Sequence, residues 1–204
     1  MAGVGAGLEQ SSVTKKYRLG LKVLDPAYAL LDAMEVRSVA TSHLVDFHYR
    51  THRWVAIGVP HGLEVVIVER MWGGGEVSSV FQLRHKLPMA RSSMGRCLLA
   101  GFEPARRRAL LKEIQAERDP ELDVEAVLTE IDQVAKHGIA RVEGGLWANL
   151  RSVGSAFCDS SGEPAGAITT WSDVGEPIGD EVEQELSEIA SRISYSLGYR
   201  GRPE

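Results

Sequence analysis

The chain has 204 residues, a length typical of one domain, and is 44% hydrophobic and 25% charged. Its formal charge is -5, whereas proteins that hold nucleic acid through many phosphate contacts are more often basic. The two cysteines, Cys97 and Cys158, form no disulfide framework, and the N-terminus lacks a secretion-signal pattern. No apolar run approaches the roughly 18 residues of a membrane span. These observations predict a cytoplasmic globular protein with free thiols.

The N-terminal half is predicted to contain a tail, one long helix and three strands. Residues 1–16 are typical of a flexible tail or linker remnant, so we expect the domain itself to span 17–204. Asp25 followed by Pro26 predicts a helix start, and the helix is expected to reach about Tyr49. Two β-branched runs around Pro-His-Gly predict a hairpin over 53–71, and a weaker third strand follows over 76–88.

The C-terminal half is predicted to contain three helices, three strands and a final helix. The helices are expected over 92–102, 103–114 and 123–137, the last with Asp123 as its N-cap and Gly138 just past its end. Strands follow over 139–143, 151–159 and 165–172, and an apolar stripe predicts a helix over 180–197. Hairpin-linked strands with grouped helices predict an α+β fold with an antiparallel sheet covered on one face.

A catalytic serine or cysteine is only weakly indicated by the sequence. Ser92 and Ser93 lie near His85, but they lack the G-x-S-x-G pattern of hydrolases, and a helix N-cap is the simpler interpretation. A small hydrolase that uses Ser93 or Cys97 stays as a minor alternative.

Metal and nucleotide sites are also disfavoured. His48 and His52 have a spacing that can share a metal, with His43 nearby, but no clear further ligand accompanies them. The glycines at 73–75 precede a strand and lack the lysine of a phosphate-binding loop. We therefore expect no metal and no cofactor.

A small-molecule pocket is the remaining candidate. The start of the helix at Ser92, Ser93 and Met94 offers unpaired backbone N–H groups that bind carboxylates and phosphates. Thr169 and Trp171 alternate on one face of a predicted strand, and Ser152 lies on its neighbour. The alternative, that Met94 and Trp171 simply fill the core, is left open by these residues.

Five segments in order resemble one known family. They are "YRLG" at 17–20, "LPMARSSMGRCLLA" at 87–100, "HGIARVEGG" at 137–145, "RSVGSAFCDSSGEPAGAITTW" at 151–171 and "SYSLGYRG" at 194–201. Together they resemble the effector-binding domain of IclR-family (isocitrate lyase regulator) bacterial transcription factors. The resemblance covers nearly the whole chain.

The resemblance implies a GAF-like fold, in which an antiparallel sheet of about six strands curves around a ligand pocket. It also implies dimers that pair into tetramers. By the same resemblance, a small organic acid or aromatic metabolite binds between the sheet and the loop-helix at 91–95. The implied pocket residues are Ser93, Met94, Val142, Leu150, Ser152, Thr169 and Trp171, to which the helix-start argument adds Ser92.

Departures from the family pattern fall on the pocket itself. Met94 is bulkier than the usual residue, and Arg96 stands where a lysine is common. Val142 replaces a frequent acidic residue, Ser152 a frequent cysteine, and Trp171 a usually smaller side chain. The resemblance therefore implies a pocket of altered size and polarity.

The implied function is that of a ligand sensor in a transcriptional regulator, not an enzyme. Only 16 residues precede Tyr17, too few for the winged helix-turn-helix domain through which the family contacts DNA. A metabolite-binding signalling module without DNA binding is the first alternative. The expected partners are a small effector and further copies of this chain, with no membrane.

Overall fold

The computed structural model describes residues 7–11, 13–71 and 86–201. The strands are β1 (Leu8–Gln10), β2 (Tyr17–Leu19), β3 (Val55–His61), β4 (Glu64–Met71), β5 (Lys86–Pro88), β6 (Ala140–Glu143), β7 (Leu150–Cys158) and β8 (Pro164–Asp173). The helices are α1 (Leu24–Ala33), α2 (Glu35–Thr51), α3 (Ser93–Gly101), α4 (Pro104–Glu117), α5 (Val124–His137) and α6 (Asp180–Ser196). Two 3-10 turns, η1 (Leu21–Val23) and η2 (Met89–Arg91), precede α1 and α3.

The centre of the molecule is an antiparallel sheet in the order β5-β4-β3-β8-β7-β6. This confirms the predicted α+β class and the curved six-stranded sheet. The long pairing of β7 with β8 sets Ser152 opposite Trp171 and Gly154 opposite Thr169. Because β8 also pairs with β3, the two hairpins predicted from sequence join edge to edge at the middle of the sheet.

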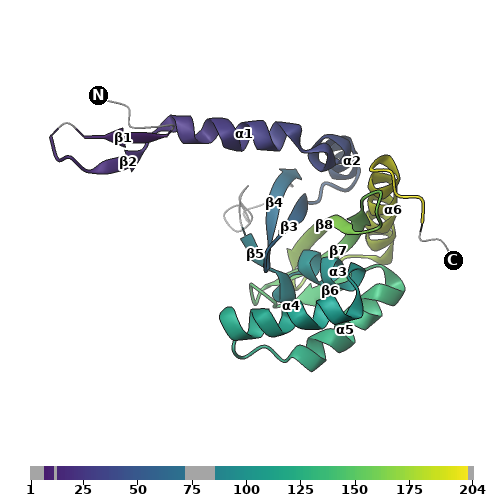
Figure 1. Ribbon diagram of the computed structural model, residues 1–204. Coiled ribbons are helices and arrows are strands. Elements are labelled where there is room, and N and C mark those ends of the chain that lie inside the picture. The colour runs from purple at the N-terminus through teal and green to yellow at the C-terminus, as the bar shows by residue number, and fades with distance from the viewer. Residues whose placement is uncertain (1–6, 12, 72–85, 202–204) are drawn as a thin grey trace.

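Helices cover both faces of this sheet, so the prediction of one covered face was wrong (Figure 1). One apolar cluster joins α3, α4 and α5 to one face and includes Ala56 and Ala167. The other joins α2 and α6 to the opposite face and includes Val55, Ile57 and Ile168. Neighbouring residues of β3 thus alternate between two cores, as the side chains of a strand must.

The predicted long helix is two helices. Asp25 lies within α1 instead of capping it. The helical conformation is interrupted at Met34, whose backbone is extended (φ -73°, ψ 104°). Helix α1 buries none of its residues, whereas α2 buries Ala40, Leu44 and Phe47 against the sheet. The break lets α2 lie on the sheet while α1 leaves the body with the β1–β2 hairpin (Figure 1).

The predicted ends of helix α5 are confirmed. Asp123 caps α5 by accepting from the Ala126 amide at 3.0 Å, and Gly138 ends it with φ 75°, a left-handed conformation that favours glycine. Most of the third strand predicted over 76–88 lies outside the described residues, which begin again at β5. β1 falls within the stretch predicted as a tail and pairs with β2, and the domain boundary at residue 17 stays a prediction.

Candidate functional site

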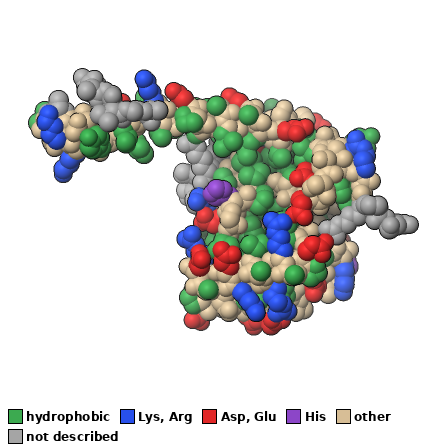
Figure 2. Space-filling view, viewed as in Figure 1, with side chains coloured by type: hydrophobic (Ala, Val, Ile, Leu, Met, Phe, Trp, Pro, Cys, Tyr) green, Lys and Arg blue, Asp and Glu red, His purple; other side chains and the backbone are tan. Residues whose placement is uncertain are grey.

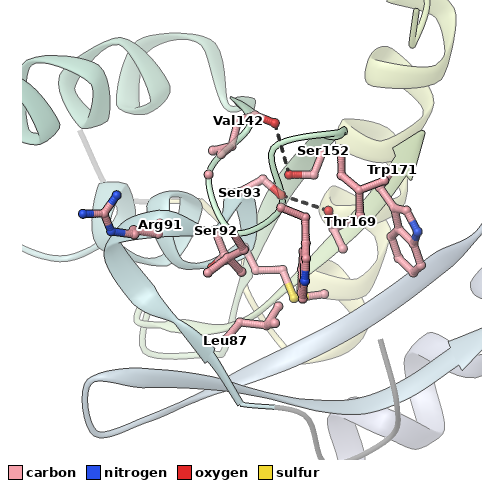
Figure 3. A pocket seen from close by; sticks show the side chains of 13 residues that line it. Leu87, Arg91, Ser92, Ser93, Val142, Ser152, Thr169 and Trp171 are labelled. Carbon is pink, nitrogen blue, oxygen red and sulfur yellow. Dashed lines mark hydrogen bonds between the residues drawn. The ribbon is translucent and has the colours of Figure 1, made fainter. Parts of the chain in front are cut away.

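The structure brings all the predicted pocket residues around one cavity between α3 and the sheet (Figure 3). Ser92, Ser93 and Met94 come from the start of α3, and Val142 from β6. Leu150 and Ser152 come from β7, and Thr169 and Trp171 from β8. Segments almost 80 residues apart in sequence thus meet because α3 lies on β7 and β8. That these residues bind a ligand stays a prediction.

The start of α3 presents donors to this cavity. The Ser92 hydroxyl oxygen accepts from the Gly95 amide at 3.1 Å, which makes Ser92 the N-cap. The amides of Ser93 and Met94, in the first turn, have no acceptor within the helix. They also lie at the positive end of the helix dipole. This end of the cavity is therefore suited to a carboxylate or another anionic oxygen.

The hydroxyl groups at the cavity form an ordered chain. Thr169 donates to the Val153 carbonyl at 2.7 Å, so its single proton is in use. Ser93, whose Oγ lies 3.0 Å from Thr169 Oγ1, must then be the donor in that contact (Figure 3). The Ser93 hydroxyl proton is therefore engaged within the protein, and of these two serines Ser92 is the one whose hydroxyl proton can be donated to a ligand.

The remaining wall is apolar and tightly filled. Met94 is fully buried, and Trp171 stacks on Trp54 with ring centroids 5.8 Å apart and planes 29° apart. The cavity offers about 30 Å³ of space to the centre of a water-sized sphere. That is room for only a few atoms. The two interpretations of Met94 and Trp171, pocket wall or core filler, therefore both describe this structure.

Sequence reasoning missed five lining residues: Leu87, Arg91, Gly145, Leu146 and Trp147. Leu146 and Trp147 lie in the loop between β6 and β7 and pack against the core. A Cβ on Gly145 would lie 2.5 Å from the Arg91 carbonyl oxygen, so only glycine lets this loop come so close. Large apolar residues directly after two glycines, in "EGGLWANL", were the available signal for a loop that covers the cavity.

Arg91 is the charged residue among those that line the cavity, and its guanidinium points away from it (Figure 3). Arg91 donates to both carboxylate oxygens of Asp119, at 2.5 and 3.0 Å, and this hydrogen bonding lowers the pKa of Asp119. Arg96, the other departure noted in the helix start, does not line the cavity. It donates to the Ala90 carbonyl and pairs with Glu130 of α5.

The described residues give no support to a nucleophile. Burial raises the pKa of the Cys97 thiol from 9.0 to about 12, and the thiol donates to the Gly154 carbonyl at 3.0 Å. A neutral buried thiol is a poor nucleophile. His85, the base considered beside Ser92 and Ser93, lies outside the described residues.

We expect Cys97 to resist alkylation while the protein is folded. At pH 8, iodoacetamide should label the partly exposed Cys158 and leave Cys97 unmodified until denaturant is added, as read by peptide mass spectrometry. Because folding raises the pKa of this thiol, its contribution to stability is present below about pH 9 and is lost as the pH rises toward 12. Labelling of native Cys97 at the rate of Cys158 would contradict the prediction.

Metal and membrane sites were also considered. Across residues 7–11, 13–71 and 86–201, no group of three or more His, Cys, Asp or Glu side chains could hold a metal ion. His48 Nδ1 lies 3.0 Å from the Arg53 carbonyl oxygen. The glycines at 73–75 lie outside the described residues. Among the helices that are described, none is long and apolar enough to cross a membrane.

The family follows from comparison of the whole chain with known proteins. A family model described as bacterial transcriptional regulator IclR C-terminal matches residues 28–195. The chain belongs to the IclR family. The predicted resemblance is confirmed, and the IclR fold accounts for the sheet and the position of α3. The cavity lies in this C-terminal, effector-binding part of an IclR regulator.

Relatives and solved structures agree with this assignment. The chain is 22% identical to the HTH-type transcriptional regulator XynR of Escherichia coli (strain K12), over 94% of this chain and 79% of XynR. IclR of Thermotoga maritima superposes with a TM-score of 0.78 at 23% identity, covering 95% of this chain and 81% of that one. An IclR homolog from Microbacterium hydrocarbonoxydans, complexed with 4-hydroxybenzoate, has a TM-score of 0.75 at 22% identity, covering 93% and 79%.

Proposed function

We propose that this IclR-family domain binds a small anionic metabolite in the cavity between α3 and the sheet. It passes the signal to DNA-binding domains without converting the ligand. The anionic end lies at the Ser93 and Met94 amides with the Ser92 hydroxyl, and the apolar part lies against Leu150 and Trp171. The observation that carries the proposal is the start of α3, whose first-turn amides have no acceptor within the helix, at a largely apolar cavity. The complex of an IclR homolog with 4-hydroxybenzoate supports it.

Regulation in this proposal is a shift between conformations. A ligand that binds one arrangement of α3 and the sheet better than another favours that arrangement by its difference in affinity. In a cytoplasmic oligomer the favoured arrangement changes the spacing of winged helix-turn-helix domains, which lie outside these 204 residues and contact the DNA. The name of XynR as an HTH-type regulator supports this assignment of ligand binding to one domain and DNA contact to another.

The N-terminal arm, defined as residues 7–11 and 13–33, is the surface we assign to self-association. Its apolar side chains are strongly exposed: Leu19 by 71%, Leu21 by 82% and Leu30 by 63% (Figure 2). A 10-residue helix that buries nothing and a hairpin with three-residue strands are each marginal alone in water. Covering this surface with the same arm of a second copy would stabilise both.

Charge along the arm fits such a pairing. Lys15 and Lys16 lie between β1 and β2, and Asp25 lies on α1, while Arg18 is paired with Glu9 of the same hairpin and Asp32 with Arg37 of α2. Two arms related by a two-fold axis and running antiparallel would set the two lysines of each against the α1 helix, with Asp25, of the other. This arrangement supports a homodimer as the basic unit, from which a tetramer can be built.

Native mass spectrometry of the purified chain tests both parts of the proposal, because it reports subunit number and retained ligand together. We expect dimers or tetramers that carry a small acid. Leu21→Asp with Leu30→Asp should yield monomers, because a buried unpaired charge is costly. Tyr49→Asp, an equally exposed position on α2, should keep the wild-type subunit number. A wild-type monomer would contradict the arm assignment. Failure of every carboxylate in a screen to bind would contradict the sensing function.

A further inference from the structure

The size of the cavity is the starting observation. Its space of about 30 Å³ compares with the roughly 150 Å³ of an engineered apolar cavity that binds benzene. An aromatic ring therefore does not fit beside the start of α3 as this protein is packed. One or more lining side chains must occupy the volume that a ring would need.

Met94 is a long, unbranched side chain in the wall of this cavity. It is fully buried, it lines the cavity, and its sulfur lies over Gly58 of β3. A Cβ on Gly58 would be only 2.8 Å from the Met94 sulfur, so the space for the Met94 thioether exists because residue 58 is a glycine. A long side chain can therefore be buried at the start of α3, because strand β3 has no side chain at the facing position.

Two wall residues of strand β8 are held more firmly than Met94. Trp171 is fixed by stacking on Trp54, and Thr169 is fixed by its hydrogen bonds to Val153 and Ser93. Methionine is unbranched, with three rotatable bonds, and adapts to gaps of irregular shape. Truncation of Met94 therefore enlarges the cavity without breaking a side-chain hydrogen bond or a ring contact of the wall.

We propose that Met94 determines the specificity of this site by excluding ring-containing ligands and selecting compact aliphatic carboxylic acids. The inference rests on the proposed function, because it names the ligand class of the same cavity. The donors for the carboxylate remain the backbone amides of α3, which do not depend on the side chain at 94. Truncation of Met94 should therefore change which acids fit and keep the anion-binding end.

The test compares three probes on three proteins. Benzene, benzoate and acetate are titrated into the wild type, Met94→Ala and Met89→Ala, and binding is followed by ligand-observed NMR and thermal unfolding. Met89 is an equally buried methionine, five residues earlier, that does not line the cavity. Met94→Ala should gain at least about tenfold in affinity for benzene and benzoate, a change that corresponds to about 1.4 kcal/mol. Acetate binding should change little, and Met89→Ala should match the wild type with all three probes.

The outcomes separate this inference from the proposed function. Equal benzene binding by wild type and Met94→Ala, or an equal gain in Met89→Ala, would overturn the role of Met94. If benzene binds only Met94→Ala while no carboxylate binds any variant, the volume argument holds and the anion-sensing function fails. Should Met94→Ala not fold, Met94→Val removes less volume, and a smaller gain for benzene is expected from it. No gain in a folded Met94→Val would count against the proposal.

Discussion

Gly95→Ala is expected to lower the free energy of unfolding by at least about 3 kcal/mol, although alanine is the better helix former. Helix propensity alone would favour alanine over glycine by about 1 kcal/mol. At position 95, however, a Cβ would lie 2.0 Å from the Met89 carbonyl oxygen and 2.4 Å from Met89 Cα. Both atoms belong to the backbone and cannot rotate away. The start of α3 would have to separate from η2, and its first-turn backbone amides would no longer line the cavity.

Urea denaturation of the two proteins measures this difference. For a chain of this size, a loss of about 3 kcal/mol corresponds to a fall of about 6 to 12 °C in Tm. Gly175→Ala is the matched control, because a Cβ there meets nothing within 4 Å and the residue does not have a positive φ. That variant should be as stable as the wild type or slightly more so. Equal stability of Gly95→Ala and wild type would mean that α3 is not packed on η2 as described.

Ser93→Trp is expected to reduce the affinity for acetate by at least about 100-fold, about 2.7 kcal/mol of binding free energy. Ser93 is buried beside the cavity, with its hydroxyl against Thr169, and the free space is about 30 Å³. An indole has nowhere to go except into that space and across the first-turn amides. Calorimetry with acetate, on samples whose circular dichroism matches the wild type, gives the measurement.

Two further variants make the result interpretable. Ser152→Trp adds the same ring from the half-buried opposite wall and should also abolish binding, with less disturbance of α3. Ser160→Trp, in the exposed turn before β8, should bind as the wild type does. Unchanged affinity in a folded Ser93→Trp protein would place the ligand elsewhere and refute the assignment of the cavity.

Local signals predicted the elements well because they act over a few residues. Asp123 and Gly138 satisfy the ends of α5 by themselves, and the two-residue turn at Gly62 and Leu63, directly after Pro60 and His61 of β3, fixes the pairing of β3 with β4. The resemblance added which distant segments meet. Without it, the alternation of Thr169 and Trp171 indicated a shared face but did not say that α3 covers that face.

The features that the sequence did not predict depend on tertiary packing. Nothing in the sequence around Met34 breaks a helix, and the break follows from α2 turning onto the sheet while Arg37 pairs with Glu69 of β4. The continuous apolar run at 54–57 was a sign of burial on both faces. Trp147 was missed because a loop residue has no periodicity that assigns it to a wall.

Strand β8 links the cavity to the segment that follows helix α2. Thr169 contacts Ser93 at the start of α3, while the next residue, Thr170, donates to the Trp54 carbonyl at 2.5 Å, just after the end of α2. Trp171 then stacks on the Trp54 ring. Under the proposed sensing function, a shift of β8 at Thr169 would reach the segment after α2 through the next residue of the same strand, Thr170.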